Sequence, residues 1–294
     1  MLTVPATPSA PLDITGKFPE LARWARTAVR LHPRLGKPDV RESSLGGPLL
    51  WPATEAWPTC TAPHEPPERA DHPPCPLAGV LQVYARDVPE LPFPDGSDML
   101  QVLWCPNTHG APWWGPWPQA FWRREVDVTD VLWDPPAPLF DEPYADLNAS
   151  RYVPEPCVLH PERVTEYPRY YDLPGGGLRE RVQAWDYKWS GDDDRLYTLA
   201  LSTAPGIKAL GYPHWYQGPA WPFCQCGRRM IHLVTFASQE DRGHYRWVPA
   251  EDDGTRLRHG DPAHGLVIGD SGDMYLFTCA ACTPRPLAGS AQFG

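Results

Sequence analysis

The sequence predicts a mainly β (α+β) fold: an internally duplicated β unit with an N-terminal helix and one or two further short helices, stabilised by zinc. Three observations support this prediction: a very high proline content, several short runs rich in Val and aromatic residues, and cysteines that recur in a repeated series of segments. Proline accounts for 39 of the 294 residues. Because proline lacks an amide hydrogen and disrupts both helices and central strands, short strands joined by ordered loops are favoured over long helices.

The domain organisation follows from the distribution of these features. Residues 1–17 are predicted to form a flexible, Pro-rich arm, and residues 18–294 a single domain. Within this domain we expect two pseudo-repeats, at about 36–140 and 141–294.

Two segments have helical patterns. A helix is predicted over residues 19–31, because Pro19 suits a first helical position and the apolar residues fall on one stripe. These residues are Leu21, Trp24, Ala25, Ala28 and Leu31. His32-Pro33 is expected to end it. A second short helix is predicted over residues 178–185, after the flexible Gly175–Gly177.

The remaining regular structure is predicted to be β. Short runs rich in Val and aromatic residues are typical of strands. They occupy residues 80–85, 99–104, 195–201, 231–237 and 274–278.

An ordered series of similar segments indicates the duplication. The first series reads 45-LGGPLLWP-52, 57-WPTC-60, 81-LQVYA-85 and 95-DGSDMLQVLWC-105. The second reads 210-LGYPHWYQ-217, 221-WPFC-224, 233-LVTFA-237 and 270-DSGDMYLFTC-279. Both contain an L-G-x-P opening, an aromatic-Pro-x-Cys segment, a strand, and a D-x-x-D-M turn followed by a strand that leads to a cysteine. The final cysteines differ by one position relative to the Asp-Met pair.

The cysteines of the second series predict a metal site. Cys224 and Cys226 form one close pair, and Cys279 and Cys282 form another. Four thiolates in two short-spaced pairs are typical of a tetrahedral Cys₄ zinc site, and Gly227 suits the tight turn after the first pair. The alternatives are a redox-active C-x-x-C motif or buried free thiols; a redox motif would open a helix, whereas Thr-Pro-Arg-Pro follows Cys282.

The repeat indicates where to look for a second zinc ion. Cys60 corresponds to Cys224 and Cys105 to Cys279, and each is followed at the same interval by a histidine, His64 or His109. These four residues predict a Cys₂His₂ site. Cys75 and His72 compete for one of these positions, and the alternative is that Cys60 and Cys105 are ordinary buried thiols. With four protein ligands, neither ion has an open position at which to activate water.

Aromatic segments are candidates for partner binding, since Trp and Tyr are effective contact residues at interfaces. The candidates are Trp113, Trp114, Trp117 and Trp122 in the first half and His214, Trp215 and Tyr216 in the second. The alternative is that they fill a loop-rich core. An enzyme with a pocket between the repeats is a further alternative, for which Lys208, His214, Asp186 and Tyr187 are the candidate groups.

Other motifs and the net charge argue against several classes of function, among them serine proteases and nucleic-acid-binding proteins. The segment 269-GDSGD-273 superficially resembles a serine protease motif, but 95-DGSD-98 occupies the equivalent place in the first series, so both are predicted to be polar turns. Asp192–Asp194 is likewise predicted to be a solvated turn. The net charge of −10 disfavours nucleic acid as a partner. Because we find neither a secretory signal pattern nor a long apolar run, we expect a cytoplasmic protein that does not bind membranes.

The motifs also carry a family resemblance. The L-G-G-P opening followed by W-P, 81-LQVYARDVPELPFP-94, 98-DMLQVLWC-105 and 204-APGIKALGYPHW-215 resemble the YwqG-like family of bacterial proteins, in its cysteine-bearing actinobacterial branch. The resemblance covers most of the chain from about residue 18. It implies a mostly β, internally duplicated domain of unknown function, and some members lie near polymorphic toxins. A more distant resemblance is to the programmed cell death protein family, whose members chaperone a ribosomal protein. The second-half opening, L-G-Y-P, and the smaller cysteine set depart from that family.

These expectations combine into one functional hypothesis. We expect a non-enzymatic, zinc-stabilised protein-binding module that acts as an immunity-like or chaperone-like factor. Its partner is expected to be another protein or a peptide, and the sequence does not indicate the oligomeric state.

Overall fold

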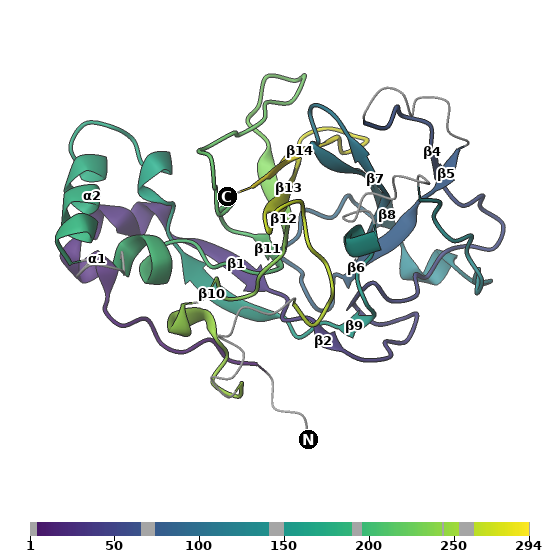
Figure 1. The fold of residues 1–294 in the computed structure, drawn as a ribbon, viewed down its shortest axis with the longest axis horizontal. Coiled ribbons are helices and arrows are strands. Elements are labelled where there is room, and N and C mark those ends of the chain that lie inside the picture. The colour runs from purple at the N-terminus through teal and green to yellow at the C-terminus, as the bar shows by residue number, and fades with distance from the viewer. Residues whose placement is uncertain are drawn as a thin grey trace.

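The computed structural model describes residues 5–65, 74–140, 150–189, 196–242, 244–252 and 262–293. Two β-sheets form the framework of the molecule, and helices α1 (Ile14–Lys17) and α2 (Leu178–Trp189) gather at one end of it (Figure 1). Among the described residues, no helix is both long and apolar enough to cross a membrane. The prediction of a mainly β fold is confirmed.

The first sheet has six antiparallel strands in the order β10-β1-β11-β12-β13-β14. Its strands are β1 (Arg26–Arg30), β10 (Glu162–Glu166), β11 (Lys208–Leu210), β12 (Ile231–Ala237), β13 (Asp273–Thr278) and β14 (Leu287–Gln292).

The second sheet also has six antiparallel strands, in the order β2-β9-β3-β6-β7-β8. Its strands are β2 (Arg34–Leu35), β3 (Ser44–Leu45), β6 (Ala78–Tyr84), β7 (Met99–His109), β8 (Gly115–Arg123) and β9 (Cys157–Val158). A separate pair joins β4 (Thr59–Cys60) to β5 (Cys75–Pro76).

The two sheets have the same strand order. The first half of the chain contributes β1 to β8 and the second half β9 to β14. If β1, β2 and β3 are exchanged with β9, β10 and β11, and β6, β7 and β8 with β12, β13 and β14, the strand order of one sheet becomes that of the other. In each sheet the first strand of one half, β1 or β9, therefore lies between the second and third strands of the other half. The two halves of the chain thus exchange one strand each.

A β-bulge occurs at the matching place in both sheets. Val80 is the extra residue between β6 and β7, and Leu233 is the extra residue between β12 and β13. The strand pairing on both sides of the bulge is the same in the two sheets, so Cys105 and Cys279 occupy equivalent positions. This register matches Met99 with Asp273, which explains the one-position difference seen between the Asp-Met pairs of the sequence.

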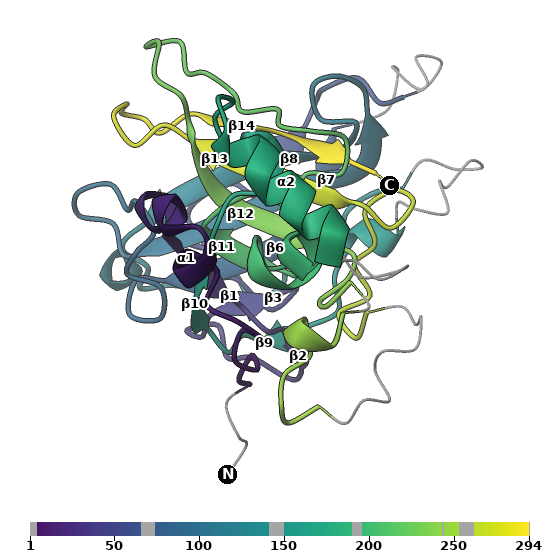
Figure 2. The ribbon, with the colours of Figure 1, turned by 90° about the vertical axis from the view of Figure 1, so that its left-hand side faces the viewer.

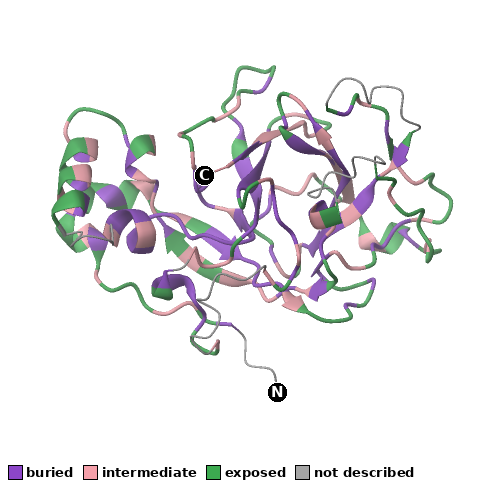
Figure 3. Cartoon of the chain, viewed as in Figure 1, coloured by how far each residue is buried: buried purple, intermediate pink, exposed green. Residues whose placement is uncertain are grey.

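The main core lies between the sheets. Trp104 of β7 and Phe236 of β12 pack edge to face, with ring centroids 4.9 Å apart, and strands β6, β7, β12 and β13 are buried along almost their whole length (Figure 3). Further members from both sheets are Val29, Leu45, Leu81, Val102, Ile207, Val234, Met274 and Leu276. Burial of this apolar surface is the principal source of stability for such an arrangement.

The helical end has its own core. It combines α1 and α2 with the short helices η1 (Pro19–Trp24), η5 (Tyr170–Asp172) and η6 (Tyr197–Leu201), the last of which is a π-helix. Figure 2 shows α2 across the face turned toward the viewer, with the sheets behind it. Buried members include Phe18, Leu21, Leu173, Val182 and Tyr197. Three further short helices are η3 (Glu125–Asp127), η4 (Ser150–Tyr152) and η7 (Tyr245–Trp247).

The helix predicted over residues 19–31 is wrong in its second half. Helix η1 ends at Trp24, and residues 26–30 form strand β1. This strand pairs with β10 on one side and β11 on the other, so its backbone groups are satisfied without a helix. Tertiary pairing outweighs the apolar stripe, because the β-branched Thr27 and Val29 fit a strand well.

The strand predicted over residues 195–201 is also wrong where the structure describes it, because Tyr197–Leu201 forms the π-helix η6. The other predicted elements are confirmed. Strands β7, β12 and β13 cover the runs at 99–104, 231–237 and 274–278. Strand β6 covers the run at 80–85 except for its last residue, and α2 begins at the predicted residue. The predicted turn at Asp192–Asp194 lies outside the described residues.

Candidate metal centres

The four cysteines of the C-terminal half converge. Their sulfur atoms all lie within 4.8 Å of one another. The Sγ atoms of Cys224 and Cys282 are 3.6 Å apart, as are those of Cys226 and Cys279. In a tetrahedral zinc site with Zn–S bonds of about 2.3 Å, neighbouring sulfurs are about 3.8 Å apart. The group therefore has the size that a tetrahedral metal ion requires.

A tight turn brings the first two cysteines together. The amide of Cys224 donates to the Arg228 carbonyl (2.8 Å), and the amide of Gly227 donates back to the Cys224 carbonyl (2.8 Å). Gly227 has φ +83°, a conformation that glycine adopts without a steric penalty. Cys279 follows the end of β13, and Cys282 lies at the turn after it. The sequence prediction for this turn is confirmed.

The environments of the C-terminal thiols differ. Cys226 is exposed, and the backbone amide of Arg228 together with the neighbouring sulfurs lowers its pKa to about 7. The sulfur of Cys224, with those of Cys226 and Cys279, raises the pKa of Cys282 to about 12. Four sulfurs this close repel one another as anions, and a divalent cation at their centre would stabilise all four thiolates.

The second group combines two cysteines and two histidines, all fully buried: Cys60, His64, Cys105 and His109. Cys60 Sγ lies 3.5 Å from His109 Nε2, and Cys105 Sγ lies 3.4 Å from His64 Nε2. Bond lengths of about 2.3 Å for sulfur and 2.0–2.1 Å for nitrogen place these atoms about 3.6 Å apart around tetrahedral zinc. This donor set also fits a metal ion.

Strands β4 and β7 and the loop that follows β4 position the four residues. Cys60 lies on β4, and Cys105 and His109 both lie on β7, which has an irregularity between them. The amide of Glu65 donates to the Thr108 carbonyl (2.8 Å), which holds His64 beside the end of β7. The ring of His64 packs against that of His109 at 4.8 Å.

The second ring nitrogen of His109 has a backbone partner. Nδ1 lies 3.3 Å from the carbonyl oxygen of Gly115, which can accept its hydrogen. Nε2 is then left with its lone pair toward the sulfur of Cys60, which is the tautomer that a metal ligand needs. The fixed ring orientation favours a structural metal site.

The sulfurs of this group also shift one another's pKa. The hydrogen bond from the Cys105 thiol is the largest of the causes that lower the pKa of Cys60 to about 3. The neighbouring sulfurs of Cys60 and Cys75 raise the pKa of Cys105. One negative charge is therefore shared between close sulfurs, which is the arrangement that a divalent cation stabilises.

Cys75 lies next to this group but outside it. It pairs with Cys60 across β4 and β5, and its thiol donates to the carbonyl oxygen of Leu139 (3.3 Å). The side-chain amide of Asn107 contacts the sulfurs of both Cys75 (3.7 Å) and Cys105 (3.6 Å). The other competitor, His72, lies outside the described residues. Sequence reasoning missed Asn107, which no spacing rule identifies.

Three of the aromatic residues expected to bind a partner are buried. Trp113 packs between the sheets, and Trp215 packs against Tyr275. His214 is also buried, and its Nδ1 has no hydrogen-bond partner in the part of the chain that the structure describes. These three belong to the core and not to an exposed groove, which corrects the expectation for them.

The other four aromatic residues are more accessible. Trp114 is 58% exposed. Trp117, Trp122 and Tyr216 are half-buried, and Trp117 packs against the ring of His109 at 5.4 Å. An exposed residue that sequence reasoning missed is Phe223, which directly precedes Cys224 and is 70% exposed. The aromatic-Pro-x-Cys pattern contained this signal, but the residue next to the cysteine received no attention.

The residues proposed for an enzymatic pocket have structural partners of their own. Lys208 forms a fully buried ion pair with Glu166. Asp186 accepts hydrogen bonds from the amides of Tyr197 (2.7 Å) and Thr198 (3.3 Å). Tyr187 is 48% exposed on α2. The contacts of Asp186 lie in the helical core and those of Lys208 in the first sheet, so these residues do not form a common catalytic arrangement.

The geometry therefore identifies two groups that could hold a metal ion, one at a corresponding end of each half. With four protein donors each, neither group leaves a position for substrate. Compared with known proteins, the chain matches no family model, and no curated protein is significantly similar to it.

Proposed function

We propose that the chain is a non-enzymatic protein-binding module whose aromatic loops are held by two structural zinc ions. The observation that carries this proposal is that an exposed aromatic side chain lies beside each metal group. Phe223 directly precedes Cys224. Trp114 lies in the turn between His109 and Gly115, whose carbonyl oxygen accepts a hydrogen bond from His109. Large aromatic residues at the surface are the type that dominates binding energy at protein interfaces.

Zinc is the metal that the donor sets favour. Thiolates and imidazoles in tetrahedral groups of four select zinc over harder cations, which prefer oxygen ligands. A closed site of this kind contributes to folding: apparent binding free energies in small zinc-binding peptides are about 10–16 kcal/mol. We infer that each ion replaces part of the core that Pro-rich loops cannot provide.

We also propose that the two halves arose by duplication. The shared strand order, the two matching bulges and the equivalent positions of Cys105 and Cys279 support this origin. A further similarity accompanies the exchanged strands, since 31-LHPR-34 follows β1 and 159-LHPER-163 follows β9. By register, Leu45 corresponds to Ala209 and not to Leu210, so the openings are offset by one residue from the sequence alignment.

The assignment to the YwqG-like family, the immunity-like or chaperone-like role and the cytoplasmic location remain parts of this proposal. The net charge of −10 favours a partner with a basic surface, because complementary charge steers association. Neither nucleic acid nor a membrane is proposed as a partner.

Site-specific crosslinking tests the proposed binding surface. A photoreactive phenylalanine analogue is placed separately at Phe223, at Trp114 and at Leu35, which is 61% exposed and serves as a control away from both metal groups. We expect one protein partner to be captured from cells at Phe223 or Trp114 and not at Leu35. Loss of the C-terminal metal, through Cys279→Ser, is expected to abolish capture at Phe223. The same products at all three positions, or none at any of them, would contradict the proposal.

A further inference from the structure

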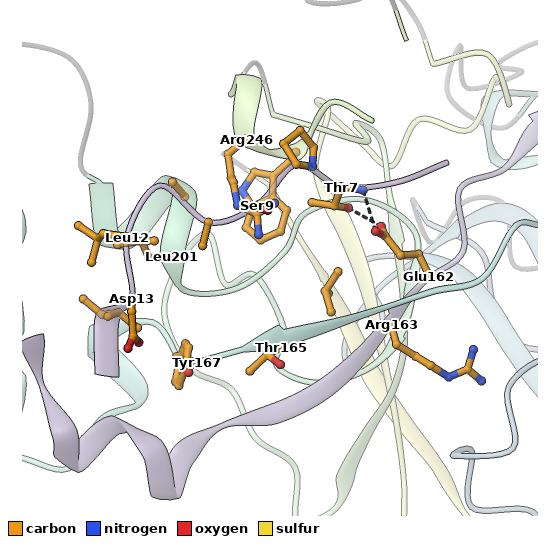
Figure 4. A pocket seen from close by; sticks show the side chains of 16 residues that line it. Thr7, Ser9, Leu12, Asp13, Glu162, Arg163, Thr165, Tyr167, Leu201 and Arg246 are labelled. Atoms are coloured by element: carbon orange, nitrogen blue, oxygen red, sulfur yellow. Dashed lines mark hydrogen bonds between the residues drawn. The ribbon is translucent and has the colours of Figure 1, made fainter. Parts of the chain in front are cut away.

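A cavity of about 310 Å³ lies beneath the N-terminal segment, far along the chain from the metal ligands. Residues 7–14 form one wall, strand β10 with Tyr167 forms another, and the ends of η6 and η7 close it. Figure 4 shows Arg246 beside Ser9 at one end, with Leu12 and Tyr167 at the other. Its volume is near the lower end of the range for small-molecule sites, roughly 300–1,000 Å³.

The N-terminal segment is held over this cavity by hydrogen bonds. The amide of Thr7 donates to Glu162 Oε1 (2.7 Å), and its hydroxyl also donates to the Glu162 carboxylate. The amide of Ala250 donates to the Ala6 carbonyl (2.9 Å), and the amide of Ala6 donates to Glu251 (2.9 Å). The wall is therefore specifically placed, and the flexibility predicted for residues 1–17 remains a prediction.

Most charged groups that line the cavity already have partners. Glu162 accepts from Thr7 and also lies 2.9 Å from His32 Nε2. Arg163 pairs with Glu90 at 2.6 Å, and Figure 4 shows its side chain pointing away from the cavity. Asp13 accepts from the amide (2.9 Å) and hydroxyl (2.7 Å) of Thr15.

Arg246 is different, because its guanidinium lacks an anionic partner among the described residues. The residue is only 9% exposed, and its Nε and Nη1 atoms are buried without hydrogen bonds. The guanidinium lies over the ring of Trp247, 4.5 Å from the centroid. The positive charge of the buried Arg30 opposes that of Arg246, and the negative charge of Glu162 favours it without a hydrogen bond between them. An unpaired buried cation is costly, so this group is set up for an anion.

We propose that this cavity binds a small carboxylic acid with a short apolar body, whose carboxylate pairs with Arg246. A guanidinium presents its donors in a planar fork that matches a carboxylate in bidentate geometry. The opposite end offers apolar contacts from Leu12 and Leu201 (Figure 4), and Ile14 also lines the cavity. These side chains suit the body of such a ligand. The proposal is independent of the metal centres and of the protein-binding function.

Isothermal titration calorimetry of the full chain with hexanoate and with 3-phenylpropionate tests the proposal. We expect at least one of these acids to bind, and hexanamide, which lacks the charge, not to bind. In Arg246→Met the affinity should fall at least about tenfold, as expected when a charge-assisted pair is lost. Arg163→Met is the matched control, since it removes a lining arginine that is already paired, and it should leave the affinity unchanged.

A stability measurement separates ligand binding from a structural role. Because the Arg246 guanidinium has no anionic partner among the described residues, and the Met side chain can keep the packing against Trp247, the melting temperature of Arg246→Met without ligand should equal or exceed that of the wild type. Arg246→Lys retains charge without the planar fork and should bind with intermediate affinity, so it tests the same claim even if the Met variant folds poorly. The proposal is overturned if neither acid binds the wild type, if Arg246→Met binds as tightly, or if inorganic phosphate binds as well as the acids do.

Discussion

At the residue scale, Cys75 and Cys105 distinguish two ways to assemble the N-terminal centre. Both sulfurs contact the amide of Asn107, but only Cys105 belongs to the group of four. We expect Cys105→Ser to lose one zinc equivalent and Cys75→Ser to keep it, because the Cys75 thiol donates to a backbone carbonyl instead. Inductively coupled plasma mass spectrometry of the purified variants measures this. The reverse result would make Cys75 the ligand.

The buried His232 should make the folded protein less stable at acidic pH. Its Nδ1 donates to the Leu210 carbonyl (2.7 Å), and its Nε2 accepts from the Thr235 hydroxyl (2.8 Å). Complete burial, with the charge of Lys208 nearby, lowers its pKa from 6.5 to about 3. Between these values the unfolded chain binds a proton that the folded chain does not, so stability is lost as the pH falls below 6.5.

Glutamine at this position can retain both hydrogen bonds but does not titrate. We therefore expect the free energy of unfolding in urea to fall more steeply for the wild type than for His232→Gln between about pH 7 and 5, which spans the upper part of this window. The difference in slope should approach about 1.4 kcal/mol per pH unit. Metal loss affects both proteins alike, and identical slopes would show that His232 does not remain neutral in the folded state.

At the element scale, the π-helix η6 depends on a single carboxylate. Asp186 of α2 accepts from the amides of Tyr197 and Thr198 and from the Thr198 hydroxyl (2.6 Å). Asp186→Ala leaves these buried donors unsatisfied, and we expect it to destabilise the fold by about 1–3 kcal/mol. The exposed Lys188 on the same helix provides the control, because Lys188→Ala should change the urea midpoint little. Equal effects of the two substitutions would contradict this role.

The elements differ in how well the sequence could predict them. Strands such as β12 and β13 and the turn at Gly227 follow from local patterns, because their apolar runs and glycine are sufficient signals. Residues 26–30 and 197–201 were assigned to the wrong element, because distant partners decide their conformation. Both Cys/His groups that could hold a metal follow from spacing and from the similar segments of the sequence. Arg246 could not be predicted, since its lack of an anionic partner among the described residues is a property of the folded chain.

At the scale of the whole molecule, the C-terminal cysteine group brings distant segments together. Cys226 and Cys279 are separated by 53 positions, and an ion that binds both closes this loop and restricts the unfolded chain. We expect Cys279→Ser to release one metal ion and to become sensitive to limited proteolysis across the C-terminal half. Ser271→Ala, in the exposed turn before β13, should keep the protease resistance of the wild type. A soluble, resistant Cys279→Ser protein with unchanged zinc would contradict a structural role.

The central claim is that two closed zinc centres hold the halves of this molecule in shape. Native mass spectrometry of the intact chain tests it most directly, because it counts the metal ions on each folded molecule. We predict two zinc ions in the wild type, one in Cys105→Ser and in Cys279→Ser, and none in the double variant. A folded wild-type chain with fewer than two ions, or single variants that retain both, would contradict the claim.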